Sequence, residues 1–436
     1  SLENVFAFCW NSDVVQDMCN CALNVLDYDV NYALKMFTDA LLNASDCMRK
    51  RVLVGGQQKA QWFDEDCKVA KNKARQLLVQ FRRNGEREQR QLYVEARRDY
   101  KQLIKNKKIS YKREKAKYLA SIGKNGKLFW KEVRQLFGRK KQGVSKQISD
   151  DQWFNHFQSL YNADTVHADY VGLLTEAGEV IDTCTELNCV ITENEVRESI
   201  RHLKKGKACG SDEVMAEMLK LADSTAICFL TKLFNVLFDS GIYPDEWAKA
   251  IIVPILKKGD CNLTTNYRGV SLLSLVSKCY TLVLNKRLVE WTEDYSKLTE
   301  SQAGFRKGYS TTDHIFTLNA IVEKCFAKKG GKLYACFVDL KIAFDSVQRE
   351  PLFEVLLKNG MNGKFMKAIV SVYKSVLSCV RIEDRYTDFF DCPVGLRQGC
   401  VLSPAIFSLF INEVASAVDS KGVHGIQFLP GLIELF

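Results

Sequence analysis

The stretch that decides the fold is LYACFVDLKIAFDSV, which runs from Leu333 to Val347. Its first part, Leu333–Val338 followed by Leu340, is an almost unbroken apolar run, and its length and its aromatic and β-branched residues predict a strand buried on both faces. One carboxylate, Asp339, interrupts the run. A lone buried carboxylate is costly unless something compensates its charge, and a bound divalent cation is one way to do so. This segment alone is equally compatible with Asp339 ending the strand and capping a helix that begins near Lys341.

The residues around this stretch resemble a known family. The pattern F-x-D-x-x-x-A-F-D at Phe337–Asp345 resembles motif A of the reverse transcriptases of non-LTR (LINE-type, jockey-like) retrotransposons. Downstream, LRQGCVLSPAIF at Leu396–Phe407 resembles motif B of the same family, in the expected order. Further upstream, NYRGVSLLS at Asn266–Ser274 resembles motif 1, SQAGFRKGYSTT at Ser301–Thr312 resembles motif 2, and GKACGSD at Gly206–Asp212 resembles an element that precedes the fingers.

The resemblance implies an α+β fold, a right-hand polymerase with fingers and a partial palm whose sheet is antiparallel, preceded by a basic and mostly helical region. The predicted organisation is a helical segment over 1–60 that ends an upstream region, a basic connector over 61–160 and a linker over 161–190. The fingers follow over 191–330 and the incomplete palm over 331–436.

Motif by motif, the resemblance also implies roles for single residues. Asp339 matches the catalytic, metal-binding aspartate, and the backbone carbonyl of Leu340 would complete that site. Phe344 matches the bulky residue that excludes a 2′-hydroxyl. The implied nucleotide-binding residues are Arg268, Arg306, Phe344, Gln398 and Gly399, and the implied supporting residues are Asp345, Ser403 and Pro404.

The implied function is RNA-directed DNA polymerisation, in which dNTPs are added to a primer 3′-hydroxyl on an RNA template. The implied cofactor is two Mg²⁺ ions, with Mn²⁺ as a substitute, because nucleotidyl transfer uses two metal ions. The implied partners are the RNA template, a DNA primer or target DNA, and dNTPs, in the nucleus and cytoplasm as a ribonucleoprotein.

The sequence also departs from the family pattern. Ile342 stands where the family has Lys, Gly269 where it commonly has Pro, and Cys209 and Ser211 at two further Pro positions. No aromatic-Ala-Asp-Asp sequence, which would supply the second pair of carboxylates, follows motif B before Phe436. We therefore expect an incomplete palm without a thumb, inactive alone. Two alternatives stay open: a remnant that only binds RNA, and a group II intron-type maturase, which shares these motifs.

Charge is distributed unevenly along the chain. Of the 62 Lys+Arg and 52 Asp+Glu residues, residues 68–141 hold 25 and 6, a net charge of +19, so the other residues hold 37 and 46, a net charge of −9. Apolar stripes at helical spacing in this basic segment predict long helices broken at Asn84-Gly85. Such helices suit phosphate binding, and the candidate contacts are Lys105, Lys107, Lys108, Lys112 and Arg113. The alternative is a solvated helical linker.

The remaining patterns are local. Thr192 and Glu195 form a capping-box pattern before a helix, and Ile251–Leu256 predicts a strand. Phe129-Trp130 and Trp153-Phe154, with Phe157 and Tyr161, are interpreted as core anchors rather than base-stacking platforms. No signal peptide or membrane-spanning run is expected, and the 16 cysteines are interpreted as reduced thiols of an intracellular protein.

Overall fold

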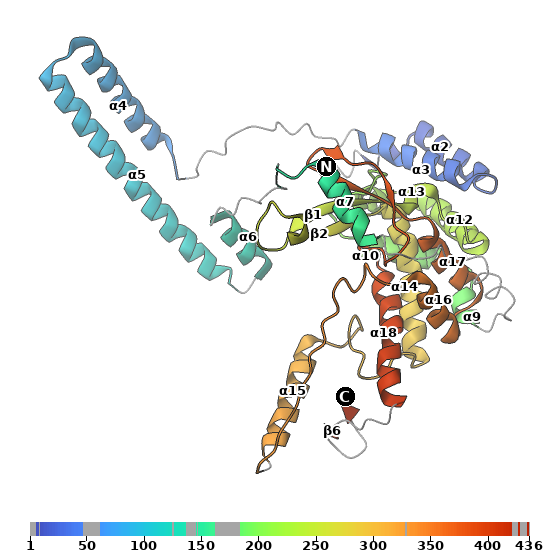
Figure 1. The fold of residues 1–436 in the computed structure, drawn as a ribbon. Helices are drawn as coiled ribbons and strands as arrows, with labels where there is room; N and C mark the ends of the chain where they lie inside the picture. Colours follow the sequence, from blue (N-terminus) through green and yellow to red (C-terminus); the bar gives the residue numbers. More distant parts are fainter. Residues whose placement is uncertain are drawn as a thin grey trace. The chain divides into compact units, whose positions relative to one another are not determined.

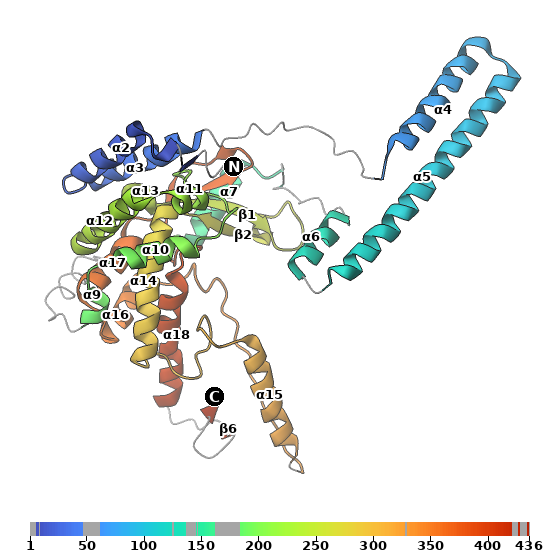
Figure 2. The same ribbon diagram turned by 180° about the vertical axis from the view of Figure 1, so that it is seen from behind.

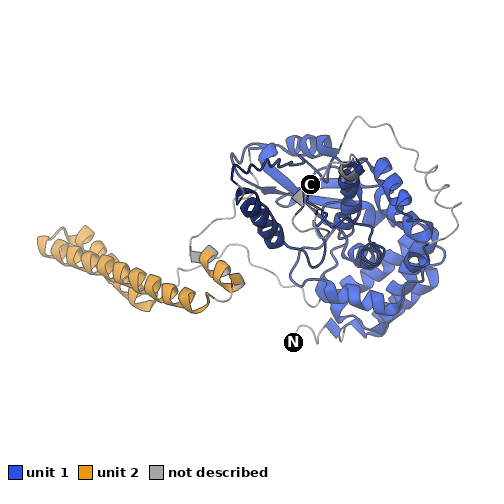
Figure 3. Cartoon of the chain, turned by 90° about the horizontal axis from the view of Figure 1, so that it is seen from below, with its two compact units in different colours: residues 1–49, 143–436 blue, residues 50–142 orange. Residues whose placement is uncertain are grey.

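The computed structural model describes residues 6–7, 9–46, 62–123, 126–136, 145, 147–161, 184–327, 329–420, 426–427 and 434–435. The chain divides into two compact units, one formed by Ser1–Arg49 with Gly143–Phe436 and the other by Lys50–Gln142 (Figure 3). The predicted linker over 161–190 lies partly outside the described residues, at 162–183.

In its described residues, the first unit combines a mixed five-stranded sheet and a separate two-stranded sheet with many helices (Figures 1 and 2). Its helices are α2 (Asp13–Val25), α3 (Val30–Ser45), α7 (Asp150–Tyr161), α9 (Thr185–Asn188), α10 (Glu193–His202), α11 (Ala216–Leu221), α12 (Ser224–Ser240), α13 (Asp245–Ala248), α14 (Leu275–Asp294), α15 (Thr311–Phe326), α16 (Arg349–Lys358), α17 (Gly363–Lys374) and α18 (Ser403–Ser420). Its strands are β1 (Lys249–Leu256), β2 (Tyr267–Leu272), β3 (Leu377–Ile382), β4 (Arg385–Tyr386), β5 (Phe390–Asp391), β6 (Ile426–Gln427) and β7 (Glu434–Leu435), with a 3-10 turn η2 (Thr264–Asn266).

The main sheet has the order β2-β1-β3-β4, with β5 also paired to β3. Strand β1 runs antiparallel to β2 and parallel to β3. The predicted strand at Ile251–Leu256 is confirmed as part of β1. The main sheet is therefore mixed: β1 is parallel to β3, while the pairs within the predicted palm, β3 with β4 and β3 with β5, are antiparallel as expected.

A helical core covers much of this unit. It centres on α12, α14 and α17, whose large buried side chains include Phe234, Tyr280 and Tyr373. The N-terminal helices belong to the same core, since the Phe37 ring of α3 stacks on Phe229 of α12 at 4.4 Å between centroids. The predicted capping box is confirmed: the Thr192 side chain accepts from the Glu195 main-chain nitrogen, and the Glu195 side chain accepts from the Thr192 main-chain nitrogen.

Helix α7 packs against the sheet and forms a second hydrophobic cluster with it. The Trp153 ring meets Tyr267 of β2 edge-on at 4.8 Å, and Phe154 meets Phe390 of β5 at 5.3 Å. The interpretation of Trp153, Phe157 and Tyr161 as core anchors is confirmed by their burial. It was wrong for Trp130, which is 59% exposed.

The stretch from Leu333 to Val347 does not form the predicted strand. Residues 331–340 have no regular structure, and the Phe337 side chain is 82% exposed. The residues that follow form turns, and the next helix, α16, begins only at Arg349, so the alternative of an Asp339 helix cap was also wrong. Strand propensity is realised only when a neighbouring strand pairs with the segment, and the described strands offer this segment no partner.

The second unit is a helical hairpin of α4 (Glu65–Asn84) and α5 (Arg87–Ser121), followed by α6 (Gly126–Leu136). The predicted break is confirmed: Gly85 caps α4 with φ +70, a left-handed conformation that glycine adopts without strain. Side chains at seven-residue spacing face the partner helix, as in an antiparallel coiled coil. These half-buried or buried positions include Cys67, Ala74 and Phe81 on α4 and Tyr93, Tyr100 and Lys107 on α5.

Two further expectations concern the described part of the chain. Fifteen cysteines there are free thiols, among them the buried Cys279 and Cys379 and the exposed Cys228 and Cys336. Among the described helices, none combines the length and apolar character that crossing a membrane requires.

Candidate functional site

The end of motif A meets the turn of motif B in three dimensions, although the two lie about fifty residues apart in sequence. The Gln398 side-chain nitrogen donates to both Asp345 carboxylate oxygens, at 2.6 Å each. The Phe344 ring stacks on Phe407 of α18 at 4.6 Å, and the Leu396 main-chain nitrogen donates to the Phe344 carbonyl at 2.8 Å. Three contacts therefore join the two motifs, and one of them, between Gln398 and Asp345, joins two of the predicted residues.

Two glycines allow the motif B turn to approach neighbouring backbone, one toward motif A and one toward β2. Gly395 has φ +84, and a Cβ on it would lie 2.7 Å from the Asp345 carbonyl oxygen. Gly399 has φ +92, and a Cβ there would lie 2.8 Å from the Ser271 carbonyl oxygen of β2. Both positions therefore demand glycine for conformation and for space. The Q-G pair is thus fixed between the end of motif A and the sheet.

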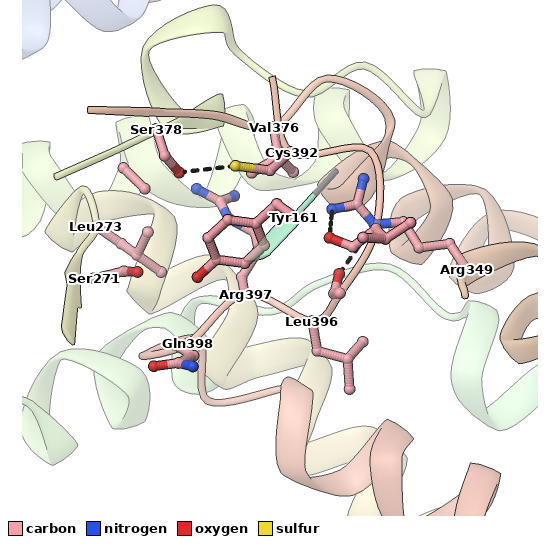
Figure 4. Close-up of a pocket in the computed structure, with 13 residues that line it drawn as sticks. Tyr161, Ser271, Leu273, Arg349, Val376, Ser378, Cys392, Leu396, Arg397 and Gln398 are labelled. Atoms are coloured by element: carbon pink, nitrogen blue, oxygen red, sulfur yellow. Dashed lines mark hydrogen bonds between the residues drawn. The ribbon is translucent and has the colours of Figure 1, made fainter. Parts of the chain in front are cut away.

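Two buried arginines, which the sequence analysis did not single out, hold the motif B turn. The Arg397 guanidinium donates to the Trp247 carbonyl at 2.7 Å and to the Tyr243 hydroxyl at 3.0 Å. Arg349 donates to three main-chain oxygens, those of Tyr373, Gly395 and Val394, at 2.6, 3.0 and 3.2 Å. Figure 4 draws the Arg349 bonds to the turn. A guanidinium with five donors suits such a set of convergent carbonyls.

We expect Arg349→Leu to lower the free energy of unfolding by about 3 kcal/mol, because it leaves three buried carbonyls without their charged donor. The measurement is urea unfolding followed by circular dichroism. The matched control is Glu354→Leu on the exposed face of the same helix, which we expect to change stability by less than about 0.5 kcal/mol. Equal small losses in the two variants would show that Arg349 does not hold the turn.

The start of α18 supports the same turn. Ser403 is buried, and its hydroxyl donates to the Arg397 carbonyl at 2.9 Å and lies 3.0 Å from the Tyr373 hydroxyl. Pro404 follows as the second residue of α18, within the first turn, where its missing N–H has no helical partner to lose. The supporting role predicted for these two residues remains a prediction, and the structure places both beneath the motif B turn.

The Asp345 carboxyl is mostly buried, and this burial raises its pKa above the ordinary value. The hydrogen bonds from the Gln398 amide and the positive charge of Lys257 act in the opposite direction and favour the ionised form. The pKa of the Tyr161 phenol is also raised, chiefly by burial and then by the nearby Asp345 charge. Sequence reasoning had treated Tyr161 only as a core anchor.

Asp339, the predicted metal ligand, lies in the irregular exposed segment, and Leu340 is also exposed. No group of three or more His, Cys, Asp or Glu side chains in the described parts of the chain is placed to hold a metal ion. The described residues therefore do not assemble a two-metal site around Asp339. Nearby, Ile342 has φ +56, which is strained for a β-branched residue and marks the backbone of motif A as unusual.

The two arginines predicted to face a triphosphate are placed differently from each other. Arg268 is exposed on β2. The Arg306 side chain is largely buried: it pairs with Glu293 at 2.8 Å, donates to the Thr299 and Gln302 carbonyls, and lies over the Tyr309 ring. With these contacts, the Arg306 side chain stabilises the loop before α15 in which it lies. Its nucleotide-binding role remains a prediction that requires the Glu293 pair to open.

The glycine-lysine loop before α11 packs against the protein itself. A Cβ on Gly210 would lie 2.5 Å from the Leu273 backbone, so this glycine permits contact between two segments of main chain. Burial raises the pKa of Asp212 to about 6, while the hydrogen bond that its carboxylate accepts from the Val214 main-chain nitrogen opposes the shift. The contacts of the loop in this structure are therefore structural.

A small cavity lies behind the motif B turn (Figure 4). Its volume of about 20 Å³ admits roughly one water molecule and no nucleotide. Its lining includes Tyr161 of α7, Ser271 of β2, and Arg397 and Gln398 of the turn. This cavity is therefore too small to hold a nucleotide. The residues that line it pack behind the motif B turn and support the candidate site.

Comparisons with known proteins agree with these motifs. Residues 255–429 match the family described as reverse transcriptase (RNA-dependent DNA polymerase). The chain is 30% identical over 229 residues to the probable RNA-directed DNA polymerase from transposon BS of Drosophila melanogaster, covering 51% of this chain and 25% of that protein. It is 27% identical over 230 residues to the RNA-directed DNA polymerase from mobile element jockey of Drosophila funebris, covering 51% and 24%.

A third relative is the transposon TX1 uncharacterized 149 kDa protein of Xenopus laevis, 26% identical over 269 residues, covering 60% of this chain and 20% of that protein. The chain thus spans about a quarter of the length of the relatives it matches. The matched residues include both motif A and motif B. The residues that join the two motifs, such as Asp345 with Gln398 and Phe344 with Phe407, therefore all lie within the match. Residues 255–429 are thus similar to the reverse transcriptase family, and two of the relatives are named as RNA-directed DNA polymerases of mobile elements.

Proposed function

We propose that this chain forms the nucleotide-binding part of an RNA-directed DNA polymerase, which extends a primer 3′-hydroxyl with dNTPs on an RNA template. The observation that carries the proposal is the junction of the two motifs, where Asp345 holds Gln398 and Phe344 stacks on Phe407. This junction supports the proposal, because Phe344, which would exclude a 2′-hydroxyl, precedes Asp345, which is bonded to Gln398 of the proposed nucleotide pocket. We propose that the enzyme acts inside the cell, in the nucleus and cytoplasm, as a ribonucleoprotein.

Divalent metal ions are general to the reverse transcriptase family, and we propose Mg²⁺ for this protein, with Mn²⁺ as a substitute. Asp339 and the Leu340 carbonyl would be ligands of that site, since both are hard oxygen donors of the kind Mg²⁺ prefers. The described residues offer no further cluster of ligands, so Asp339 would need carboxylates from elsewhere.

The experiment is primer extension by the full-length gene product on a defined RNA template, with Mg²⁺ and each dNTP supplied or omitted in turn. We expect extension that stops at the template position whose complementary dNTP is missing. Extension that ignores the template sequence, or no extension on either RNA or DNA, would contradict the proposal. The second case would leave nucleic-acid binding without catalysis as the function.

We also propose that the hairpin of α4 and α5 binds nucleic acid through its phosphates. Lys105, Lys112 and Arg113 are exposed on α5 and available for contact. The other two candidates have partners within the hairpin: Lys107 forms ion pairs with Asp64 and Asp66, and the Lys108 ammonium lies 4.7 Å from the centre of the Trp62 ring. Lys107 therefore has a structural role in joining the two helices, and Lys105, Lys112 and Arg113 carry the binding proposal.

We expect RNA binding by this chain to weaken with salt, with a log–log slope of about −3 to −5 for five or so phosphate contacts. Deleting residues 68–141 should flatten the slope, because that segment carries the net charge of +19. Replacing Lys105, Lys112 and Arg113 together with Ala should reduce the slope by about 2, because each neutralised phosphate of a single strand contributes about 0.7 to it.

Fluorescence anisotropy with a labelled RNA across a salt series measures these slopes. Lys107→Met is the matched control, because it removes one charge that already has two carboxylate partners, and we expect its slope to equal that of the unchanged chain. Equal slopes for the chain, the deletion and the triple variant would show that the hairpin is a solvated connector.

A further inference from the structure

The helical hairpin of α4 and α5 has two different faces. The core residues that each helix turns toward the other recur every seven positions, at Cys67, Ala74 and Phe81 on α4 and at Tyr93, Tyr100 and Lys107 on α5. Positions one residue after or three residues before a core residue lie on one flank of a helix, and positions two after or one before lie on the other flank. The two helices lie side by side and antiparallel (Figures 1 and 2). A two-fold axis perpendicular to such a pair relates its helices, so equivalent flanks lie on the same face of the hairpin.

The first flank is basic on both helices. Its eleven positions in α4 and α5 hold eight Lys or Arg, three aliphatic residues and no Asp or Glu. These eight cations form the basic face, which consists of Lys68, Lys71, Arg75, Arg82, Arg90, Arg97, Lys101 and Lys108. The twelve positions of the opposite face hold the two cations Lys73 and Arg83 and the three carboxylates Asp66, Glu95 and Asp99. The net charges of the two faces are therefore +8 and −1.

Most cations of the basic face are available to a partner. Six of the eight are exposed and have no carboxylate partner among the described residues. The other two are Lys68, which pairs with Glu65, and Lys108, whose ammonium lies over the Trp62 ring. A surface that gathers charges of one sign attracts polyanions, and here that attraction is directed to one side of the hairpin.

The dimensions of the basic face fit a duplex better than a single strand. Its cations form two rows, one on each helix, and packed helices lie about 8–10 Å apart. The major groove of a B-form duplex is about 12 Å wide, so each row can approach the phosphates of one strand. From Arg90 to Lys108 the row on α5 extends over about 27 Å, the length of about eight base pairs. Proteins that hold single strands use aromatic stacking platforms, and none of the eleven positions of this face is aromatic.

We infer that the basic face of the hairpin binds a nucleic-acid duplex along its two phosphate backbones, and that the opposite face makes no contact with it. This inference rests on the proposed binding of nucleic acid by the hairpin. It adds the class of nucleic acid that is bound and the side of the hairpin that binds it.

Two matched double variants of this chain test which face binds. Arg75→Gln with Lys101→Gln removes one Arg and one Lys from the basic face, and Arg83→Gln with Lys73→Gln removes one of each from the opposite face. All four residues are exposed, so circular dichroism should show unchanged helix content in both variants. Binding is measured by fluorescence anisotropy with a labelled DNA duplex of two helical turns across a salt series.

We expect the basic-face variant to reduce the log–log salt slope by about 1.8, because each neutralised phosphate of B-form DNA contributes about 0.9 to it. Its affinity at about 0.1 M salt should fall at least about tenfold. The opposite-face variant should lose less than about twofold, because salt screens charges that lie farther from the duplex than about 10 Å.

Competition against the labelled duplex tests the class of nucleic acid. We expect the unlabelled duplex to displace the probe at a nucleotide concentration at least about fivefold lower than either of its separated strands, because the duplex offers phosphates to both rows. Equal losses in the two double variants, or a single strand that competes as well as the duplex, would overturn the inference and leave phosphate binding by the hairpin in place.

Deleting residues 68–141 distinguishes these results from a failure of the proposed function. The deletion should abolish the difference between duplex and single strand and flatten the salt slope. Duplex affinity and slope that the deletion leaves unchanged, or a chain that binds neither duplex nor single strand, would contradict both the inference and the proposed binding of nucleic acid by the hairpin.

Discussion

Asp339→Asn is expected to reduce primer extension by the full-length gene product at least about 1,000-fold, which corresponds to about 4 kcal/mol of transition-state stabilisation. The proposed reason is that the amide removes an anionic metal ligand while preserving the size of the side chain. Asp339 lies in an exposed irregular segment and makes no helix cap, so the substitution should leave the unfolding transition unchanged. Extension is measured on a primed RNA template at saturating dNTP.

The matched control for this prediction is Asp384→Asn, which changes an exposed aspartate in the turn between β3 and β4. It should extend primers at the unchanged rate. Asp339→Asn with the activity of the control would remove Asp339 from the catalytic machinery, and a loss of stability of about 1 kcal/mol instead would restore the capping interpretation.

Phe344→Val is expected to reduce the preference for dNTPs over rNTPs by at least about tenfold, because the smaller side chain leaves room for a 2′-hydroxyl. The structure supports the assignment by placing the Phe344 ring between Phe407, stacked at 4.6 Å, and Phe305, edge-on at 5.9 Å. Two flanking rings hold Phe344 in one orientation, as a residue that excludes by shape requires. The measurement is the ratio of kcat/KM for a dNTP to that for the matching rNTP.

Phe410→Val provides the control. Phe410 also lies on α18 and packs against the core, but the ring contacts of Phe344 are with Phe305 and Phe407. It should lower stability somewhat and leave the ratio unchanged. If Phe344→Val loses activity toward both nucleotides equally, the residue supports the fold of the site and does not select the sugar.

Local patterns in the sequence predicted local structure well. The capping box at Thr192 and Glu195, the strand at Ile251–Leu256 and the helix break at Gly85 each depend on residues a few positions apart. The order and the amino-acid sequences of motifs A and B also predicted that Gln398 and Phe344 belong to one site. The two motifs do meet, through the bonds between Gln398 and Asp345, and Gly395 allows their backbones to approach.

Features that depend on distant partners could not be predicted in this way. The apolar run at Leu333–Leu340 has the composition of a buried strand, yet a strand exists only where another pairs with it. The roles of Arg349 and Arg397 depend on carbonyls contributed by other segments, which no spacing in the sequence reveals. Arg306 resembles a triphosphate ligand by motif, but its nearest carboxylate, Glu293, comes from α14.

The most direct test of the claim that motifs A and B form one nucleotide site is photo-crosslinking. The full-length gene product, bound to a primed RNA template, is irradiated with a photoreactive dNTP complementary to the next template base, and the adduct is mapped by mass spectrometry. We expect adducts within residues 339–345 and 396–400, suppressed by excess of the same natural dNTP and not by a non-complementary one. Adducts confined to other segments, or suppressed equally by every dNTP, would contradict the claim.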